Sequence, residues 1–206
     1  MNPSGIGSSL PIDVSQAIAS GDIQTLIQMI QGERVRLLDT QLVDQVKAVQ
    51  ARNDKIAKLN DVLSKLTAFQ GAIDGTEAKS KVKDWNWDKV DQLEIPLNDA
   101  IAEAGITDLG FTGAGRVTPG PGQSLDDGHG HVLRGQTNIC NGDTNKGQID
   151  AAITKVKGLI DAESNNQQMD MLRLQSLNNK KNESVEILTN TQKKQTDSNT
   201  SIIRNI

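Results

Sequence analysis

The sequence predicts an all-α fold: a long antiparallel helical hairpin, or coiled coil, with an irregular Gly-rich insertion between its two helices. Residues 33–70 repeat apolar side chains at heptad spacing. From residue 148 onward Gly158 is the only glycine and there is no proline. Aromatic residues are only 2% of the chain, and because such side chains normally dominate core burial, an extended helical shape is favoured over a thick globular core.

The overall composition excludes several classes of partner. The net charge is −4, from 22 basic and 26 acidic residues, so the chain lacks the basic footprint of a nucleic-acid-binding protein. A single cysteine, Cys140, rules out an internal disulfide. No apolar run approaches the roughly 20 residues needed to cross a bilayer. We therefore expect neither nucleic acid nor a direct membrane span among the interactions of this chain.

The N-terminal segment, residues 1–32, contains no lysine or arginine, and its only charged residues are Asp13 and Asp22. A secretory signal needs a basic region followed by a continuous apolar stretch, and both are missing. Two interpretations remain open: a polar N-terminal arm, or an export signal that is neither cleaved nor strongly hydrophobic. Ser20-Gly21-Asp22 predicts a break, with Asp22 as the N-cap of a helix that follows.

Residues 33–75 are expected to form the first coiled-coil helix, because five consecutive heptads place apolar residues at eight of ten seam positions. These eight residues are Val35, Leu38, Leu42, Val49, Ile56, Leu59, Leu63 and Leu66. Gln45 and Arg52 fill the other two positions, and polar residues in a seam commonly fix the register or the partner. Gly71 and the turn sequence DGTE at 74–77 predict the end of the helix.

Residues 76–146 are expected to form an irregular insertion with short helices and a Gly-rich loop. The stretch EIPLNDAIAEAG predicts one of these helices, and the segment 105–147 predicts loop or very short strands because eleven of its residues are glycine. Trp85 and Trp87 have two interpretations. They anchor a small cap on the helical pair, or they form a surface contact, since tryptophan is enriched at binding hot spots.

The sequence gives only weak signals for catalytic and metal-binding residues. Asp126, Asp127, His129 and His131 could ligate a metal, but their spacing matches no zinc or calcium pattern, which favours a solvated loop. Cys140 could pair with one of the histidines, yet no helix begins beside it to lower its pKa. We therefore predict no catalytic residue, no metal site, no cofactor and no enzymatic activity.

Residues 147–206 are expected to form the long C-terminal helix. Its first turns carry Ile153, Val156 and Ile160, which should pack on the first helix. A helix of nearly 60 residues would approach 90 Å, at about 1.5 Å per residue, so its second half should lack an intramolecular partner. Heptads continued from Met171 place Asn178 among the seam residues of that half. Its predicted polymerisation interface comprises Met171, Leu174, Leu177, Val185, Leu188, Gln192, Gln195, Asn199, Ile202, Ile203 and Ile206.

Two interpretations of this second half stay open. The rows of glutamine and asparagine could mark only a solvated helix surface. Three isoleucines within residues 202–206, each worth roughly 2 kcal/mol when buried, instead favour a partner that also offers side-chain hydrogen bonds. Identical copies provide this, and a contact between copies that does not close generates a helical filament.

The serine-rich, base-free N-terminus, the heptad helix, the Gly-rich middle and the Gln/Asn/Ser/Thr-rich final helix together resemble the hydrophilic translocators of type III secretion systems. These are the needle-tip and EspA-like filament proteins. The resemblance implies a secreted structural protein on the bacterial surface, exported with its signal uncleaved. It also implies polymerisation at the needle tip into a hollow filament that extends the conduit for effectors and translocators to host cells. The implied partners are further copies of the chain, the needle protein, pore-forming translocators and a cytoplasmic chaperone before export.

Two alternatives accompany this interpretation. One is a needle-tip cap that forms a small closed ring and never a filament. The other is a non-secreted coiled-coil adaptor or chaperone-type protein, for which the base-free N-terminus would be incidental.

Overall fold

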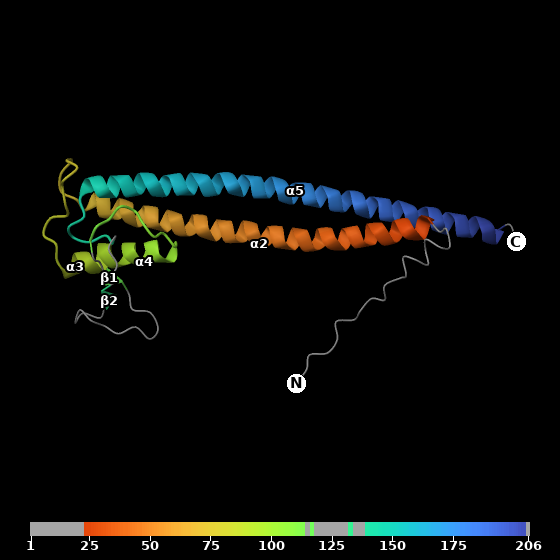
Figure 1. The fold of residues 1–206 in the computed structure, drawn as a ribbon, viewed down its shortest axis with the longest axis horizontal. Coiled ribbons are helices and arrows are strands. Elements are labelled where there is room, and N and C mark those ends of the chain that lie inside the picture. The colour runs from red at the N-terminus through yellow and green to blue at the C-terminus, as the bar shows by residue number, and fades with distance from the viewer. Residues whose placement is uncertain (1–22, 114–115, 118–131, 134–138, 205–206) are drawn as a thin grey trace, which may run out of the picture. The chain divides into compact units, whose positions relative to one another are not determined.

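The computed structural model describes residues 23–113, 116–117, 132–133 and 139–204. Two long helices dominate it, α2 (Ile23–Gly71) and α5 (Lys146–Arg204). The chain divides into unit 1, made of Met1–Ala48 and Asp170–Ile206, and unit 2, Val49–Met169. In each unit a stretch of α2 runs beside a stretch of α5 in the opposite direction (Figure 1). A mostly helical fold in which the two long helices pack together is thus confirmed.

Helix α2 follows the predicted heptads but has different ends. All ten predicted seam positions, including Gln45 and Arg52, are buried or half-buried. The helix begins at Ile23, ten residues before the predicted start, because Gly32 is accommodated inside it. A glycine at such a position costs only about 0.5–1 kcal/mol relative to alanine, and neighbouring seam positions continue on both sides of it. The helix ends at Gly71 rather than residue 75, and the Ala72 N–H donates to the Phe69 carbonyl over 3.1 Å.

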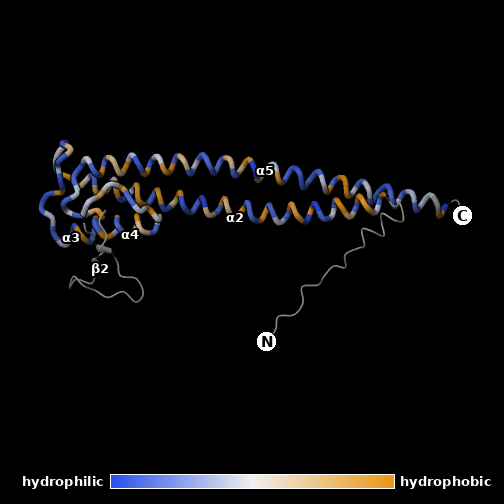
Figure 2. The backbone as a smooth tube through the Cα atoms, viewed as in Figure 1, coloured by the Kyte–Doolittle hydropathy of each residue, from blue (hydrophilic) through white to orange (hydrophobic). Residues whose placement is uncertain are grey.

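Helix α5 has its own heptad repeat, and both helices alternate between hydrophobic and hydrophilic residues (Figure 2). Its buried and half-buried seam residues are Ile149, Ile153, Val156, Ile160, Glu163, Gln167, Asp170, Leu174, Leu177, Lys181, Ser184, Leu188, Thr191 and Gln195. The heptads continued from Met171 coincide with this seam at Leu174, Lys181, Leu188 and Gln195, whereas Met171, Asn178 and Gln192 are exposed beside it. The polar Ser184 and Thr191 occupy seam positions that a search for apolar residues does not find.

Unit 2 contains a well-packed apolar core. Three short helical segments follow one another beside the long helices: α3 (Trp87–Lys89), η1 (Val90–Glu94) and α4 (Ile95–Glu103). Together with α2, α5 and the connecting loops they bury Val62, Leu66, Phe69, Leu97, Ala100, Leu109, Phe111, Ile149, Ala152 and Val156. This core stabilises the insertion against the helix pair of unit 2.

The two tryptophans have different environments. Trp85 is half-buried, and its ring centroid lies 5.8 Å from that of Phe69 with the planes tilted by 43°. A Cβ on Gly142 would approach the Trp85 ring to 2.6 Å, so that position favours glycine. Trp87 opens α3 and is 39% exposed. Trp85 therefore belongs to the core of unit 2, whereas Trp87 faces solvent.

The Gly-rich segment contributes two short strands, β1 (Arg116–Val117) and β2 (Val132–Leu133). They pair antiparallel, with Arg116 opposite Leu133 and Val117 opposite Val132. The candidate metal ligands Asp126, Asp127, His129 and His131 lie outside the described residues.

A buried polar clamp joins α4 to the segment that leads into α5. The Asn98 side chain accepts a hydrogen bond from the Cys140 N–H over 3.1 Å and donates one to the Cys140 carbonyl over 2.9 Å. Burial raises the pKa of the Cys140 thiol to about 12, so the thiol stays protonated at neutral pH. Asn98 thus satisfies both backbone groups of a residue that is itself fully buried.

Replacing Asn98 by alanine should destabilise unit 2 by about 2 kcal/mol, because two buried backbone groups lose their partner. Cys140 is the only cysteine, so its rate of reaction with a thiol reagent under native conditions reports the opening of this clamp. We expect N98A to react at least tenfold faster than the parent chain. The exposed Gln92 of η1 is the control position, and Gln92→Ala should leave the rate unchanged. Equal rates for N98A and Q92A would contradict the role of the clamp.

Candidate assembly interface

The seam between α2 and α5 in unit 1 holds few large apolar side chains. Among the described residues of this unit, Leu38 is the only large apolar residue that is buried, and it keeps 7% of its surface exposed. Val35, Leu42, Leu174, Leu177 and Leu188 are half-buried. Since most helical stability in proteins comes from packing an apolar face, this pair of helices is weakly held compared with the core of unit 2.

Polar contacts fill the remainder of the unit 1 seam. Gln28 Nε2 donates to Gln195 Oε1 over 2.7 Å, and Lys181 Nζ lies 2.5 Å from Asp39 Oδ1. Ser184 is fully buried, and its hydroxyl donates to the carbonyl of Lys180 in the preceding turn. These contacts satisfy the polar atoms that they join but add little hydrophobic stabilisation to the seam of unit 1.

An exposed row of apolar residues runs along α2 on one side of the unit 1 seam. We call this row the isoleucine stripe. It consists of Ile23, Ile27, Ile30 and Leu37, which are 69%, 36%, 56% and 54% exposed. Gln41 and Asp44 continue the same helical row, and with Arg173 and Lys180 of α5 they line a groove of about 750 Å³. The isoleucine stripe therefore lies on the side of unit 1 to which this groove opens.

A second exposed row lies along α5, and it contains no charged residue. This uncharged face consists of Met171, Gln175, Asn178, Asn182, Val185, Thr189, Gln192, Thr196, Asn199 and Ile203, all of them exposed. The Thr189 and Thr196 hydroxyls donate to the carbonyls of Val185 and Gln192 in the preceding turn. Their hydrogen-bond donors are thus already used within the helix.

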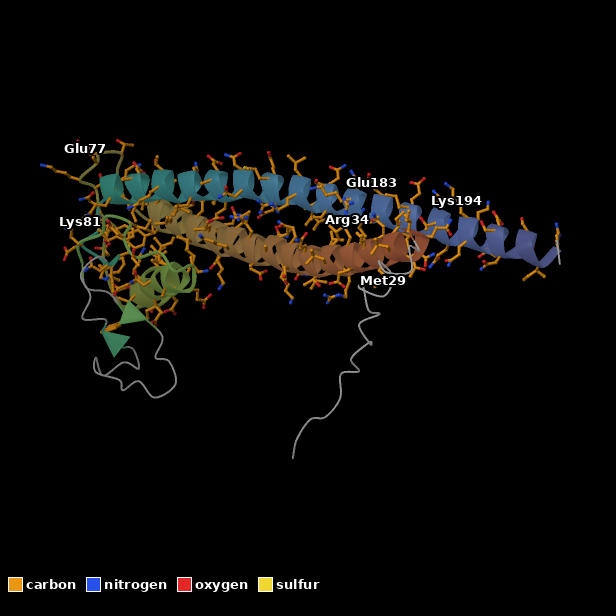
Figure 3. All side chains as sticks on the ribbon, turned by 45° about the vertical axis from the view of Figure 1, so that its right-hand side comes forward. Met29, Arg34, Glu77, Lys81, Glu183 and Lys194 are labelled. Atoms are coloured by element: carbon orange, nitrogen blue, oxygen red, sulfur yellow. The ribbon has the colours of Figure 1, made fainter. Side chains whose placement is uncertain are left out.

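The charged residues of the same stretch are sorted away from this face. Within 171–204, Lys181 lies in the seam, and the others are Arg173, Lys180, Glu183, Glu186, Lys193, Lys194, Asp197 and Arg204. Figure 3 labels Glu183 and Lys194 among these, with Met29 and Arg34 on the α2 part of unit 1. An exposed helix surface that only met water would normally mix both kinds of residue, so the sorting indicates a contact surface.

The isoleucine stripe and the uncharged face lie on opposite sides of the seam of unit 1. In an antiparallel helix pair, the positions that flank the seam on one side of the first helix face the equivalent positions of the second. Arg173 and Lys180 flank the α5 seam on the groove side, with the isoleucine stripe. The uncharged face flanks the α5 seam on the other side, where Asp39 of α2 reaches Lys181. Unit 1 thus presents two different surfaces that point away from each other.

On the side of the seam where the uncharged face lies, α2 also exposes apolar residues. Val43 and Val46 are 53% and 42% exposed there. The charged residues of this side are already paired within the unit: Arg36 with Glu33, and Asp39 with Lys181. A partner on this side would therefore meet few unpaired charges.

The structure separates the predicted polymerisation residues into two groups. Leu174, Leu177, Leu188 and Gln195 are half-buried seam residues, so α2 covers more of α5 than expected. The early start of α2 explains the cover of Gln195, which Gln28 reaches. Leu177 instead lies beside Gln45, a residue within the predicted first helix. Met171, Val185, Gln192, Asn199 and Ile203 remain exposed on the uncharged face. The Ile202 side chain and Ile206 lie outside the described residues.

The helix-pair residues Ile153, Val156 and Ile160 belong to unit 2 and are half-buried or buried. The predicted site residues do not include the isoleucine stripe, because most of the stripe falls within the segment predicted as the N-terminal arm. The heptad pattern also does not identify Gln175, Asn182, Thr189 and Thr196 as members of the uncharged face. Mapping the charged residues of α5 onto a helical wheel would find them.

Comparison of the chain with protein-family models, curated protein sequences and solved structures gives no match. No helix within the described ranges is both long and apolar enough to cross a membrane. The described residues also contain no cluster of three or more histidine, cysteine, aspartate or glutamate side chains placed to hold a metal ion.

Proposed function

We propose that this chain is a secreted structural protein that polymerises at the tip of a type III secretion needle. The polymer is a hollow filament that extends the conduit for effectors and translocators to the host cell. The proposal is supported by the combination of a base-free N-terminus, two long packed helices and a Gly-rich insertion between them. Its partners are further copies of the chain, the needle protein and pore-forming translocators, with a cytoplasmic chaperone before export.

The uncharged face of α5 is the single observation that carries self-assembly. Burying an unpaired charge at an interface is strongly unfavourable, whereas neutral side chains that find hydrogen-bond partners are tolerated. A row of exposed residues without charge can therefore be buried at small desolvation cost. Its apolar members Met171, Val185 and Ile203 would contribute roughly 1 kcal/mol each when their remaining exposed surface is buried.

Self-assembly is tested by negative-stain electron microscopy of the purified chain, together with light scattering over a concentration series. An open polymer gives uniform fibres whose mean length grows with concentration. A species of fixed small size at every concentration would overturn the filament and leave the closed cap or the adaptor.

Export is tested separately by fusing a reporter to residues 1–32 in a bacterium with a type III system. Secretion of the reporter is expected to require the secretion apparatus and to occur without cleavage. A reporter that stays inside the cell would contradict the needle-tip assignment, whatever the result of microscopy.

Removing residues 202–206 should abolish filaments and leave the helix content of the chain nearly unchanged. Ile203 is 74% exposed, so its loss removes little internal packing, while a neighbouring copy would lose an apolar contact. Circular dichroism measures the helix content, and microscopy measures the filaments. Filaments of normal abundance from the truncated chain would show that this end lies outside the interface.

A further inference from the structure

We propose that each contact in the polymer joins the isoleucine stripe of one copy to the uncharged face of the next. This inference rests on the self-assembly proposed above and names the two surfaces that meet. Both belong to unit 1, and both are exposed. The occupant of each surface is a second copy of this chain.

The chemistry of the two surfaces is compatible. The stripe offers Ile23, Ile27, Ile30 and Leu37, and the face offers methyl and methylene groups of Met, Val, Thr and Gln side chains between amides. No charged side chain of the uncharged face would be buried by this contact. Arg34 interrupts the stripe, and its long side chain can carry the guanidinium to the wet edge of the contact.

The charged residues fall at the border of such a contact. Arg173 and Lys180 line the groove beside the stripe, where they would remain hydrated at the rim. Interfaces between proteins generally have this organisation, with charge depleted in the centre and polar groups at the rim. The asparagine and glutamine amides of the face can hydrogen-bond to one another and to water along the same edge.

The placement of the two surfaces determines what kind of assembly results. Because they lie on opposite sides of the unit 1 seam, a copy that uses its stripe still has its uncharged face free. A contact between two different surfaces is heterologous, and it continues indefinitely unless its rotation closes a ring. A contact of the uncharged face with itself would instead close after two copies and leave the apolar residues of the stripe in water.

The inference is tested with two double variants that each block one surface. I30E/L37E places carboxylates in the stripe, and V185E/Q192E places them in the uncharged face. All four positions are exposed, so the helix content should match that of the parent chain. N179E/N190E is the matched control, because it adds two carboxylates to exposed α5 positions outside both surfaces.

Native mass spectrometry and analytical ultracentrifugation then measure the species at a concentration where the parent chain forms fibres. We expect each blocked variant alone to be a monomer and the control to polymerise. A 1:1 mixture of the two blocked variants should form a heterodimer and nothing longer, because one intact stripe can meet one intact face. The dissociation constant of the heterodimer should be at least tenfold lower than the dissociation constant for self-association of either variant.

The outcomes separate this inference from the proposed function. A parent chain that polymerises while the mixture stays monomeric would overturn the pairing of stripe and face and leave the filament intact. A stripe variant that still dimerises, with a face variant that does not, would replace the pairing by a contact of the face with itself. A parent chain that stays monomeric at every concentration would overturn the proposed self-assembly.

Discussion

Replacing Phe69 by alanine should lower the free energy of unfolding of the chain by about 3–5 kcal/mol. Phe69 is fully buried in the core of unit 2 and lies in ring contact with Trp85. The substitution removes an aromatic ring and leaves a cavity between α2 and the insertion.

Urea unfolding followed by circular dichroism and by tryptophan fluorescence measures this effect. The fluorescence of Trp85 should change already in the native state, since its neighbour is lost. Gln50→Ala, at an exposed position of the same helix, is the control and should change the stability by less than about 0.5 kcal/mol. A loss below about 1 kcal/mol in F69A would show that the insertion is not anchored at this point.

Replacing Glu163 by glutamine should destabilise the chain by roughly 2–3 kcal/mol at neutral pH. Glu163 lies in the α5 seam of unit 2, where its side chain is only 14% exposed. Its two oxygens lie 2.5 Å from Lys55 Nζ and 2.5 Å from an Arg52 guanidinium nitrogen. In the variant, the cations Lys55 and Arg52 lie beside a neutral amide instead of a carboxylate. The loss of the opposite charge destabilises the fold, and it affects Arg52 more because Arg52 is less exposed to water than Lys55.

The effect of E163Q should depend on pH. Hydrogen bonds from Lys55 and Arg52 lower the pKa of Glu163 from its ordinary value of 4.5, against the opposing effect of burial. A lowered folded-state pKa stabilises the fold fully above 4.5, and this contribution is lost as the pH falls through the lowered value. The difference in unfolding free energy between the parent and E163Q should therefore stay constant from about pH 7 to about pH 5 and shrink from there towards about pH 3. A difference that is constant over this range would show that the ion pairs contribute nothing.

The heptads of α2 could be predicted from the sequence because apolar residues fill most of its seam. Val35, Leu42 and Ile56 define a row that no other register reproduces. The start of the helix could not be predicted in the same way. The sequence predicts a helix after Asp22 and a coiled-coil helix from residue 33, because the apolar heptads begin at Val35. The structure joins both into one helix from Ile23, and Gln28 contacts Gln195.

The seam of α5 is harder to predict because its second half is polar. Ser184 and Thr191 occupy seam positions, and the apolar Met171 and Val185 lie outside the seam. Counting apolar residues therefore selects the exposed row. The clamp between Asn98 and Cys140 joins residues 42 positions apart, and no local sequence pattern predicts such a contact.

The weak seam of unit 1 also has a consequence for motion. Local opening of a protein requires the least free energy where few apolar contacts are broken, and Leu38 is the only large apolar residue buried among the described residues of this unit. The two helices here should separate transiently far more often than the helices that enclose Phe69 and Val156. Each separation frees two complementary helix surfaces at once, so neighbouring copies could exchange helices without unfolding the core of unit 2.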